Sequence, residues 1–185
     1  MPIRRTEKYE KIVIFTKNNK QQFANINELP LLSLEFDSIK NDNKFVYCKD
    51  MKRIFVYDDD ELIMDFTCDE LKSIGTINDS YLYIYKENNK CGIVAASKIT
   101  KKASQNNKVL INNNYDEIIN KGYGVFYIKK DNKIGLYEAY ENVFIKPKYD
   151  KIEETEYDNV YQLYTGEFCD LVYISNKKTS TLVQN

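Results

Sequence analysis

The sequence predicts an all-β fold, an array of antiparallel three-strand repeat units that is either open or closed on itself. Aromatic residues are abundant, with 16 Tyr and 9 Phe, whereas the 185 residues include only 6 Gly and 3 Pro. Aromatic side chains suit a pleated, half-buried strand. One pattern of lysine and aspartate also recurs along the chain, and such recurrence is the sequence signature of a repeat array. With 43% apolar and 30% charged residues, the chain has the composition of a folded domain.

The recurring pattern places an aspartate seventeen positions after a lysine, with apolar residues at matching places between them. Three pairs share this spacing, namely Lys20 with Asp37, Lys52 with Asp69, and Lys133 with Asp150. A fourth copy runs from Lys90 to Asp116 and is about ten residues longer, because a polar stretch interrupts it. We expect that insertion, residues 99–108, to be an exposed and mobile loop.

Each copy contains strands joined by tight turns. Short aromatic runs occupy residues 44–49, 81–86, 124–130 and 160–164, and a polar turn, "DMK", "ENNK" or "DNK", follows each of the first three. A second apolar run comes next, which is typical of a hairpin. A third short apolar run precedes each corner aspartate, so one unit is predicted to hold three strands.

The whole chain, residues 1–185, is therefore predicted to be a single β-repeat domain. Its predicted parts are a leading half unit at 11–29, units at about 30–61, 62–108, 109–142 and 143–175, and a flexible tail at 176–185.

Two kinds of residue mark the corners of the repeat. Each corner aspartate is predicted to cap a turn by accepting a hydrogen bond from a backbone N–H two residues later. Gly92 and Gly135, which follow the lysines by two positions, are predicted to supply either a positive φ or a close approach of two backbones.

These residues resemble WG-repeat proteins, bacterial arrays whose units run approximately Lys-x-Gly-Leu-Ile-Asp, a turn, Ile-x-Pro-x-Tyr-Asp and an aromatic strand. The stretch "DNKIGLYEAYENVFIKPKYDKIE" (131–153) matches best, and "YKENNKCGIVAAS" is next. The tryptophan that names the family is replaced by Ile134 and Cys91 in these copies. The resemblance implies a β-rich binding scaffold with no shared catalytic residues.

Several kinds of chemistry are excluded or disfavoured by composition. The chain has no His, so it has neither a Ser-His-Asp nor a Cys-His arrangement. No phosphate-binding Gly-rich motif is present, and no cofactor is predicted. Its four cysteines lack C-x-x-C spacing and are expected to be reduced thiols of a cytoplasmic protein; they are Cys48, Cys68, Cys91 and Cys169. No apolar run is long enough to cross a membrane, and we expect no membrane partner.

The residues predicted to bind a partner form the acidic run Asp58, Asp59, Asp60 and Glu61. When the copies are aligned on their lysines and aspartates, this run corresponds to residues 138–142 of the best-matching copy, which are predicted to form a turn. Exposed carboxylates of this kind attract a protein with a basic surface. Two other interpretations are a solvated turn and a Mg²⁺ or Ca²⁺ site, and no metal ligand is predicted because adjacent residues of an extended chain point in opposite directions.

The function predicted from these observations is non-catalytic binding of a protein partner, in the manner of an immunity protein, inhibitor or adaptor. A second interpretation is a nucleic-acid-binding protein, because tyrosines could stack on bases and basic residues cluster at 4–11. The near balance of 27 basic and 28 acidic residues disfavours it. A third is a carboxylate- and metal-dependent hydrolase, and a fourth is a carbohydrate-binding array, which the absence of Trp disfavours.

Overall fold

The fold is given by a computed structural model, which describes residues 12–25, 36, 39–42, 45–48, 52–58, 61–98, 107–175 and 178–184. Within these ranges all regular secondary structure is β-strand. No helix in the described part of the chain could span a membrane.

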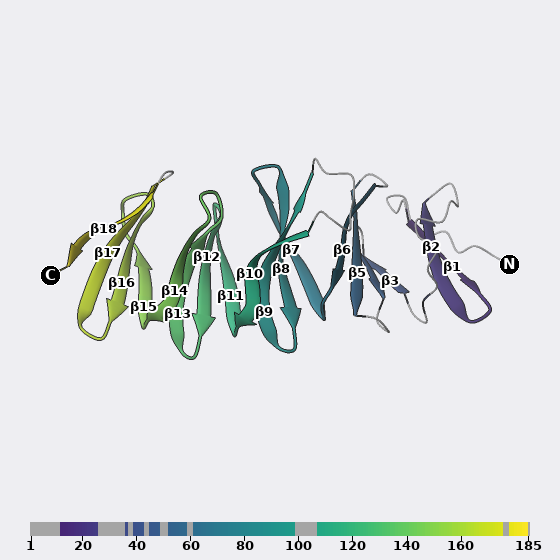
Figure 1. The fold of residues 1–185 in the computed structure, drawn as a ribbon, viewed down its shortest axis with the longest axis horizontal. Helices are drawn as coiled ribbons and strands as arrows, with labels where there is room; N and C mark the ends of the chain where they lie inside the picture. Colours follow the sequence, from purple (N-terminus) through teal and green to yellow (C-terminus); the bar gives the residue numbers. More distant parts are fainter. Residues whose placement is uncertain are drawn as a thin grey trace.

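The strands form one hairpin followed by four sheets, and all strand pairs are antiparallel (Figure 1). The hairpin comprises β1 (Ile12–Lys17) and β2 (Lys20–Asn25). The first sheet comprises β3 (Ile39–Asp42), β4 (Phe45–Cys48), β5 (Arg53–Asp58) and β6 (Glu61–Thr67). The second comprises β7 (Glu70–Ile77), β8 (Ser80–Glu87), β9 (Lys90–Ser97) and β10 (Asn107–Tyr115). The third comprises β11 (Glu117–Gly122), β12 (Val125–Lys130), β13 (Lys133–Glu138) and β14 (Val143–Tyr149). The fourth comprises β15 (Lys151–Glu154), β16 (Val160–Thr165), β17 (Phe168–Ser175) and β18 (Lys178–Gln184).

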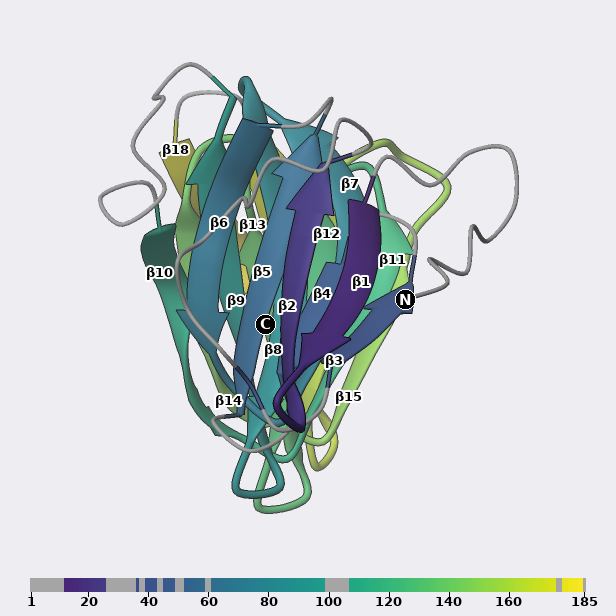
Figure 2. The ribbon, with the colours of Figure 1, turned by 90° about the vertical axis from the view of Figure 1, so that its right-hand side faces the viewer.

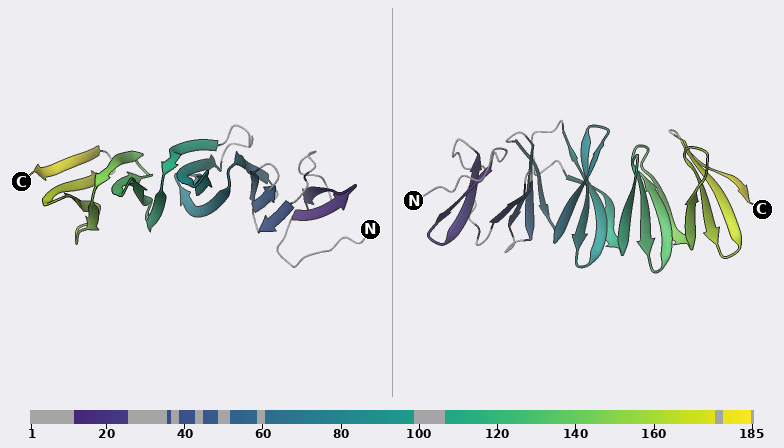
Figure 3. Two further views of the ribbon diagram at one scale, coloured as in Figure 1. Left: turned by 90° about the horizontal axis from the view of Figure 1, so that it is seen from below. Right: turned by 180° about the vertical axis from the view of Figure 1, so that it is seen from behind.

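The sheets follow one another along the long axis of the molecule, with the β1–β2 hairpin at one end and the fourth sheet at the other (Figures 1 and 3). Seen along that axis, they lie one behind the next (Figure 2). The predicted all-β array is therefore confirmed, and it is open.

Each sheet has four strands where three were predicted, because the segment after each corner aspartate also pairs. These additional strands are β3, β7, β11 and β15. A sheet thus runs from one corner aspartate to the next. The strand that precedes each aspartate is the last strand of its sheet. The predicted units instead begin with that strand. Residues 178–184, predicted as a flexible tail, form β18, because the free backbone edge of β17 is available for pairing.

Among the described residues, four cores separate the five layers, and the central strands of the second and third sheets contribute to two cores each. Tyr83 and Tyr85 of β8 pack toward the first sheet, whereas Leu82 and Ile84 pack toward the third. Side chains alternate between the two faces of a strand. A strand buried on both faces therefore becomes a continuous apolar run, which accounts for "YLYIY" and "GIVAA".

The tight turns require a positive φ, whereas Gly135 is required for the close packing of two strands. Asn88 and Asn89 have φ of 51° and 62°, and Asp131 and Asn132 have 50° and 60°, as a two-residue type I′ hairpin requires. Gly135 is needed for close approach, since a Cβ there would lie 2.3 Å from the carbonyl oxygen of Ile145. Of the two predicted roles for this glycine, the close approach of two backbones is correct.

The corner aspartates cap turns, as predicted, but through a different N–H. Asp69 accepts a hydrogen bond from the backbone N–H of Asn88 at 2.8 Å, nineteen residues away. The equivalent bonds run from Asp131 to Asp116 and from Gly166 to Asp150, both at 2.9 Å. The prediction of a donor two residues later is wrong, because the chain reverses and brings the hairpin turn of the following sheet to the carboxylate. Asp37 lies outside the described residues.

The second oxygen of each corner carboxylate accepts a hydrogen bond from a lysine of the preceding sheet. The pairs are Lys52 with Asp69 at 2.7 Å, Lys90 with Asp116, and Lys133 with Asp150. Each aspartate therefore links the start of the third strand of one sheet, or for Lys52 the residue just before it, to the hairpin turn of the next. This contact accounts for the recurring spacing between lysine and aspartate in the sequence.

These corner contacts predict a loss of stability in acid. The lysine ammonium and then the turn N–H hold the pKa of Asp69, Asp116 and Asp150 below the ordinary value of 3.8. A carboxyl group whose pKa is lowered by folding stabilises the protein above the unfolded pKa, and that contribution is lost as the pH falls through the folded pKa. Thermal unfolding between about pH 5 and pH 2 should show a steeper fall in melting temperature for the wild type than for the triple Asp→Asn variant. Parallel curves would contradict the role given to the corners.

Candidate interaction surface

The hairpin turns lie on two opposite edges of the stack. One edge, here the lower edge, carries the turns at 18–19, 88–89, 131–132 and 166–167 and the corner contacts (Figure 1). The opposite edge, here the upper edge, carries the turns at 78–79, 123–124, 139–142 and 155–159. On the lower edge the corner carboxylates and turn N–H groups are used in bonds between neighbouring sheets. The upper edge carries three exposed tyrosines in its turns.

The predicted acidic run includes the last residue of β5 and the first residue of β6, and the repeat pattern predicts that it lies on the upper edge. Asp58 ends β5, Glu61 begins β6, and their backbones pair. Asp59, Asp60 and the side chains of Asp58 and Glu61 lie outside what the structure describes, so their role in binding stays a prediction.

Three tyrosines in turns of the upper edge are exposed, unlike most tyrosines of the strands. Tyr123 is 95% exposed, Tyr140 49% and Tyr157 67%. Tyr123 also has a φ of 47°, which is uncommon for a residue with a large side chain. Tyrosine rings combine a large apolar surface with a hydrogen-bonding hydroxyl, and they are enriched where proteins bind one another.

A buried carboxylate holds the turn that presents Tyr140. Glu138 is 7% exposed. One of its carboxylate oxygens accepts the N–H of Tyr140 and the other accepts the N–H of Glu141, both at 2.8 Å. Gly124 lies against the Tyr140 ring, and a Cβ at this glycine would come within 2.8 Å of it. The position of Tyr140 is therefore fixed by its own turn and by the neighbouring one.

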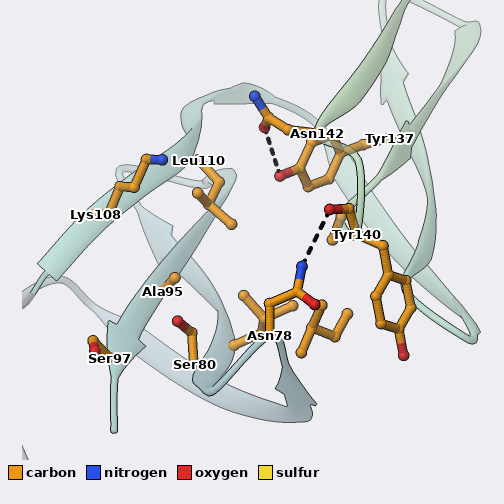
Figure 4. A pocket seen from close by; sticks show the side chains of 12 residues that line it. Asn78, Ser80, Ala95, Ser97, Lys108, Leu110, Tyr137, Tyr140 and Asn142 are labelled. Carbon is orange, nitrogen blue, oxygen red and sulfur yellow. Dashed lines mark hydrogen bonds between the residues drawn. The ribbon is translucent and has the colours of Figure 1, made fainter. Parts of the chain in front are cut away.

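A groove of about 290 Å³ lies on the upper edge between the second and third sheets (Figure 4). Its apolar lining includes Leu82, Ala95 and Leu110, and Ser80 and Lys108 add polar groups. Two hydrogen bonds fix its wall. The Asn78 amide donates to the Tyr140 carbonyl oxygen at 3.1 Å. The Tyr137 hydroxyl donates to the Asn142 side-chain oxygen at 3.0 Å.

Tyr137 itself is buried, which raises its pKa to about 12, with a smaller contribution from the charge of Glu138. The Tyr137 hydroxyl therefore remains a protonated hydrogen-bond donor at neutral pH.

A second groove of about 310 Å³ adjoins the first and shares Asn78 and Tyr140 with it. Its remaining lining residues are Tyr123, Glu138, Glu141, Asn159 and Ile174. Tyr140 thus forms part of the wall of both grooves. Together the grooves join the turns of three consecutive sheets along one edge.

The exposed charges beside the second groove are mostly acidic. Glu141, Glu156 and Asp158 are exposed in the turns of this edge. Lys121 is the nearest basic residue along the chain to Tyr123, and its ammonium group forms an ion pair with Glu154 at 3.1 Å. Aromatic rings beside carboxylates are suited to binding cationic groups.

Among the described residues, no group of three or more Cys, Asp or Glu side chains is placed to hold a metal ion. The described part of the acidic run belongs to two strand ends, Asp58 and Glu61. What the upper edge can offer chemically is stacking, hydrogen bonding and charge.

Comparisons with known proteins leave the function open. Neither the scan against protein-family models nor the search of curated proteins found a match, so the resemblance to WG-repeat proteins stays a prediction. A solved structure, the complex of the fission yeast SREBP-SCAP binding domains, is similar with 10% sequence identity and a TM-score of 0.30. The alignment covers 100% of this chain and 60% of that one, so this chain spans less than two thirds of that chain's length.

Proposed function

We propose that this chain is a non-catalytic binding protein that acts by forming a stoichiometric complex with another protein, as an immunity protein, inhibitor or adaptor does. The observation that carries the proposal is the pair of adjoining grooves whose shared wall includes a half-exposed tyrosine, Tyr140. Stacked repeats suit this role because they create one broad surface while each sheet is stabilised by its neighbours.

The partner's chemistry follows from the charges of the upper edge. The acidic hairpin at 58–61 and the exposed Glu141, Glu156 and Asp158 favour a partner with a basic surface. Arginine is the side chain best suited to contact Tyr140 and Tyr123, since its guanidinium group stacks on aromatic rings and pairs with carboxylates.

The proposal is tested first by identifying the partner and then by weakening the surface. The partner would be captured from the native cell, identified by mass spectrometry and prepared in pure form. Tyr140→Ser should weaken its binding at least about tenfold in biolayer interferometry, because exposed tyrosines in fixed positions often dominate binding energy.

Phe168→Ser is the matched control. Phe168 is 75% exposed but lies next to the lower-edge turn at 166–167, and its substitution should leave affinity unchanged. Equal affinities for wild type and Tyr140→Ser would refute the proposed surface. Turnover of the captured molecule by the purified chain would refute the non-catalytic role and favour a hydrolase, whereas capture of a nucleic acid would favour a nucleic-acid-binding protein.

The acidic hairpin should affect the rate of association more than the final contacts. Replacing Asp58, Asp59, Asp60 and Glu61 together by Ser or Asn should slow association at low salt and leave the melting temperature nearly unchanged. At about 0.1 M salt, charges are screened beyond roughly 10 Å, so the difference between wild type and variant should shrink as salt is added. Stopped-flow measurements over a range of salt concentrations test this, and equal rates at low salt would make the run an ordinary solvated turn.

A further inference from the structure

The two grooves of the upper edge differ in the charge of their walls. Glu138 and Glu141 line the second groove, and none of the other described residues that line it is basic. Lys108 lines the first groove (Figure 4), and no acidic side chain is among the described residues that line it. A cationic group is therefore attracted to the second groove and repelled from the first.

The carboxylate of Glu138 is buried without a cationic partner in the described part of the chain. Glu138 is 7% exposed and accepts two backbone N–H groups, which supply hydrogen bonds but no full positive charge. Among the described residues, no lysine or arginine forms an ion pair with it. A carboxylate can accept about four hydrogen bonds, so about two acceptor positions remain. Because buried charges are normally paired, this carboxylate points to a cationic ligand.

Tyr123, which also lines the second groove, occupies a backbone position that does not favour tyrosine. Its φ is 47°, and it is 95% exposed, so burial does not offset the cost of this conformation. In the second sheet the equivalent turn position holds Asn78, with a φ of 46°. Asparagine tolerates this conformation better than tyrosine does. An exposed aromatic ring at a strained position indicates a role in binding.

The walls of the second groove suit a guanidinium group better than an ammonium group. They combine the rings of Tyr123 and Tyr140 with the carboxylates of Glu138 and Glu141. A guanidinium group is planar, stacks on aromatic rings and donates hydrogen bonds in a fixed fork that matches a carboxylate. An ammonium group is more strongly hydrated and lacks this fork. The second groove therefore suits the side chain of an arginine.

The first groove suits an apolar side chain close to that arginine. Its lining includes Leu82, Ala95 and Leu110, and it shares Asn78 and Tyr140 with the second groove. Side chains on the same side of an extended peptide are two residues and roughly 7 Å apart. One extended segment can therefore place a side chain in each of two grooves that share a wall.

We propose that the two grooves together bind a short extended segment of the partner. An arginine side chain of the segment enters the second groove, and an apolar side chain two residues away enters the first. This inference rests on the proposed function, because the segment belongs to the protein partner. It adds the recognition element that such a partner must carry.

Nuclear magnetic resonance titration of the full chain with two synthetic peptides tests the proposal. The probes are acetyl-Leu-Gly-Arg-amide and acetyl-Arg-Gly-Leu-amide, which present the two side chains in both chain directions. At least one should bind with a millimolar or lower dissociation constant and shift the amide signals of Tyr123, Glu141 and Leu110. Citrulline in place of arginine keeps the shape without the charge and should weaken binding at least about tenfold. Glycine in place of leucine should weaken it at least about threefold.

Two variants of the second groove separate binding from folding. Tyr123→Asn introduces the residue of the equivalent turn in the second sheet, so the melting temperature should not fall. It should weaken the better peptide at least about threefold, because a ring that stacks on the guanidinium group is lost. Glu141→Gln should weaken the same peptide by a similar factor. Glu167→Gln is the matched control, since Glu167 is exposed in a lower-edge turn, and it should leave the affinity unchanged.

Four results would each overturn the proposal. They are no binding of either peptide, equal affinities for the arginine and citrulline peptides, no contribution from the leucine, and unchanged affinity in Tyr123→Asn and Glu141→Gln. The proposed function is judged separately, by the effect of Tyr140→Ser on the captured partner. If that substitution weakens the partner while neither peptide binds, the binding function stands and this recognition element is wrong. If the arginine peptide binds as expected but the partner is unaffected by Tyr140→Ser, the proposed function fails and the arginine site stands.

Discussion

Gly135→Ala is expected to destabilise the protein by about 3 kcal/mol, a large fraction of the stability of a typical domain. The added Cβ would lie 2.3 Å from the Ile145 carbonyl oxygen, 2.6 Å from the Pro147 nitrogen and 2.7 Å from the Lys146 carbonyl carbon. All three are backbone atoms of β14, so no side-chain rotation can relieve the overlap. The strands β13 and β14 would have to separate where their register already shifts. Denaturant unfolding followed by circular dichroism measures this loss.

Gly166→Asn is the matched control for that substitution. Gly166 has a φ of 58°, and a Cβ added there would have no atom within 4 Å. Asparagine tolerates this backbone conformation better than most residues, and Asn88 and Asp131 hold the same place in the other turns with φ of 51° and 50°. Its backbone N–H would still be available to Asp150. The control should change stability by less than about 0.5 kcal/mol, and an equal loss in the two variants would contradict the steric explanation.

Glu138→Ala is expected to cost about 2 to 3 kcal/mol and also to weaken partner binding. It removes a buried carboxylate that accepts two backbone N–H groups, those of Tyr140 and Glu141. These two part-buried donors would lose the carboxylate that accepts their hydrogen bonds. Tyr140 would then be held less firmly between the two grooves. Thermal unfolding measures the first effect, and the affinity for the identified partner measures the second.

Glu141→Ala separates the structural effect from a simple loss of charge. Glu141 is exposed in the same turn, so its removal should leave the melting temperature nearly unchanged. If Glu138→Ala were as stable as Glu141→Ala, the buried carboxylate would not be what holds the turn.

Much of the fold could be predicted from the sequence because the corner contacts require particular residues at fixed distances. The spacing of Lys133 and Asp150 reflects a contact between their side chains. The strand after each aspartate could not be predicted in the same way because it carries little apolar signal. In β11 and β15, only Ile118 and Ile152 are buried. A strand with one buried residue does not show the alternation from which strands are recognised.

The candidate surface could be predicted only in part. A row of like charges, as at 58–61, can be recognised in a sequence. Whether a given tyrosine is exposed or buried cannot be read from the sequence in the same way. Tyr137 and Tyr140 are three residues apart, and the first is 1% exposed whereas the second is 49% exposed. The available signal was the repeat frame, which places Tyr140 in a turn and Tyr137 in a strand. The groove itself depends on how the second and third sheets pack against each other, and no local sequence pattern predicts this packing.

The corner aspartates also determine how a chain of this kind can change its length during evolution. A segment running from just after one corner to the next, such as residues 117–150, contains one complete sheet together with the aspartate that links it to the following turn. Its loss would join Asp116 directly to β15 and bring Leu82 and Ile93 against Ile152 and Leu163, which are apolar like the residues they replace. Duplication of the same segment would insert one additional sheet, again with a corner aspartate directly before its first strand. Gene rearrangements with these boundaries preserve the corner contacts and the apolar packing between sheets, whereas a cut within a hairpin leaves an unpaired strand.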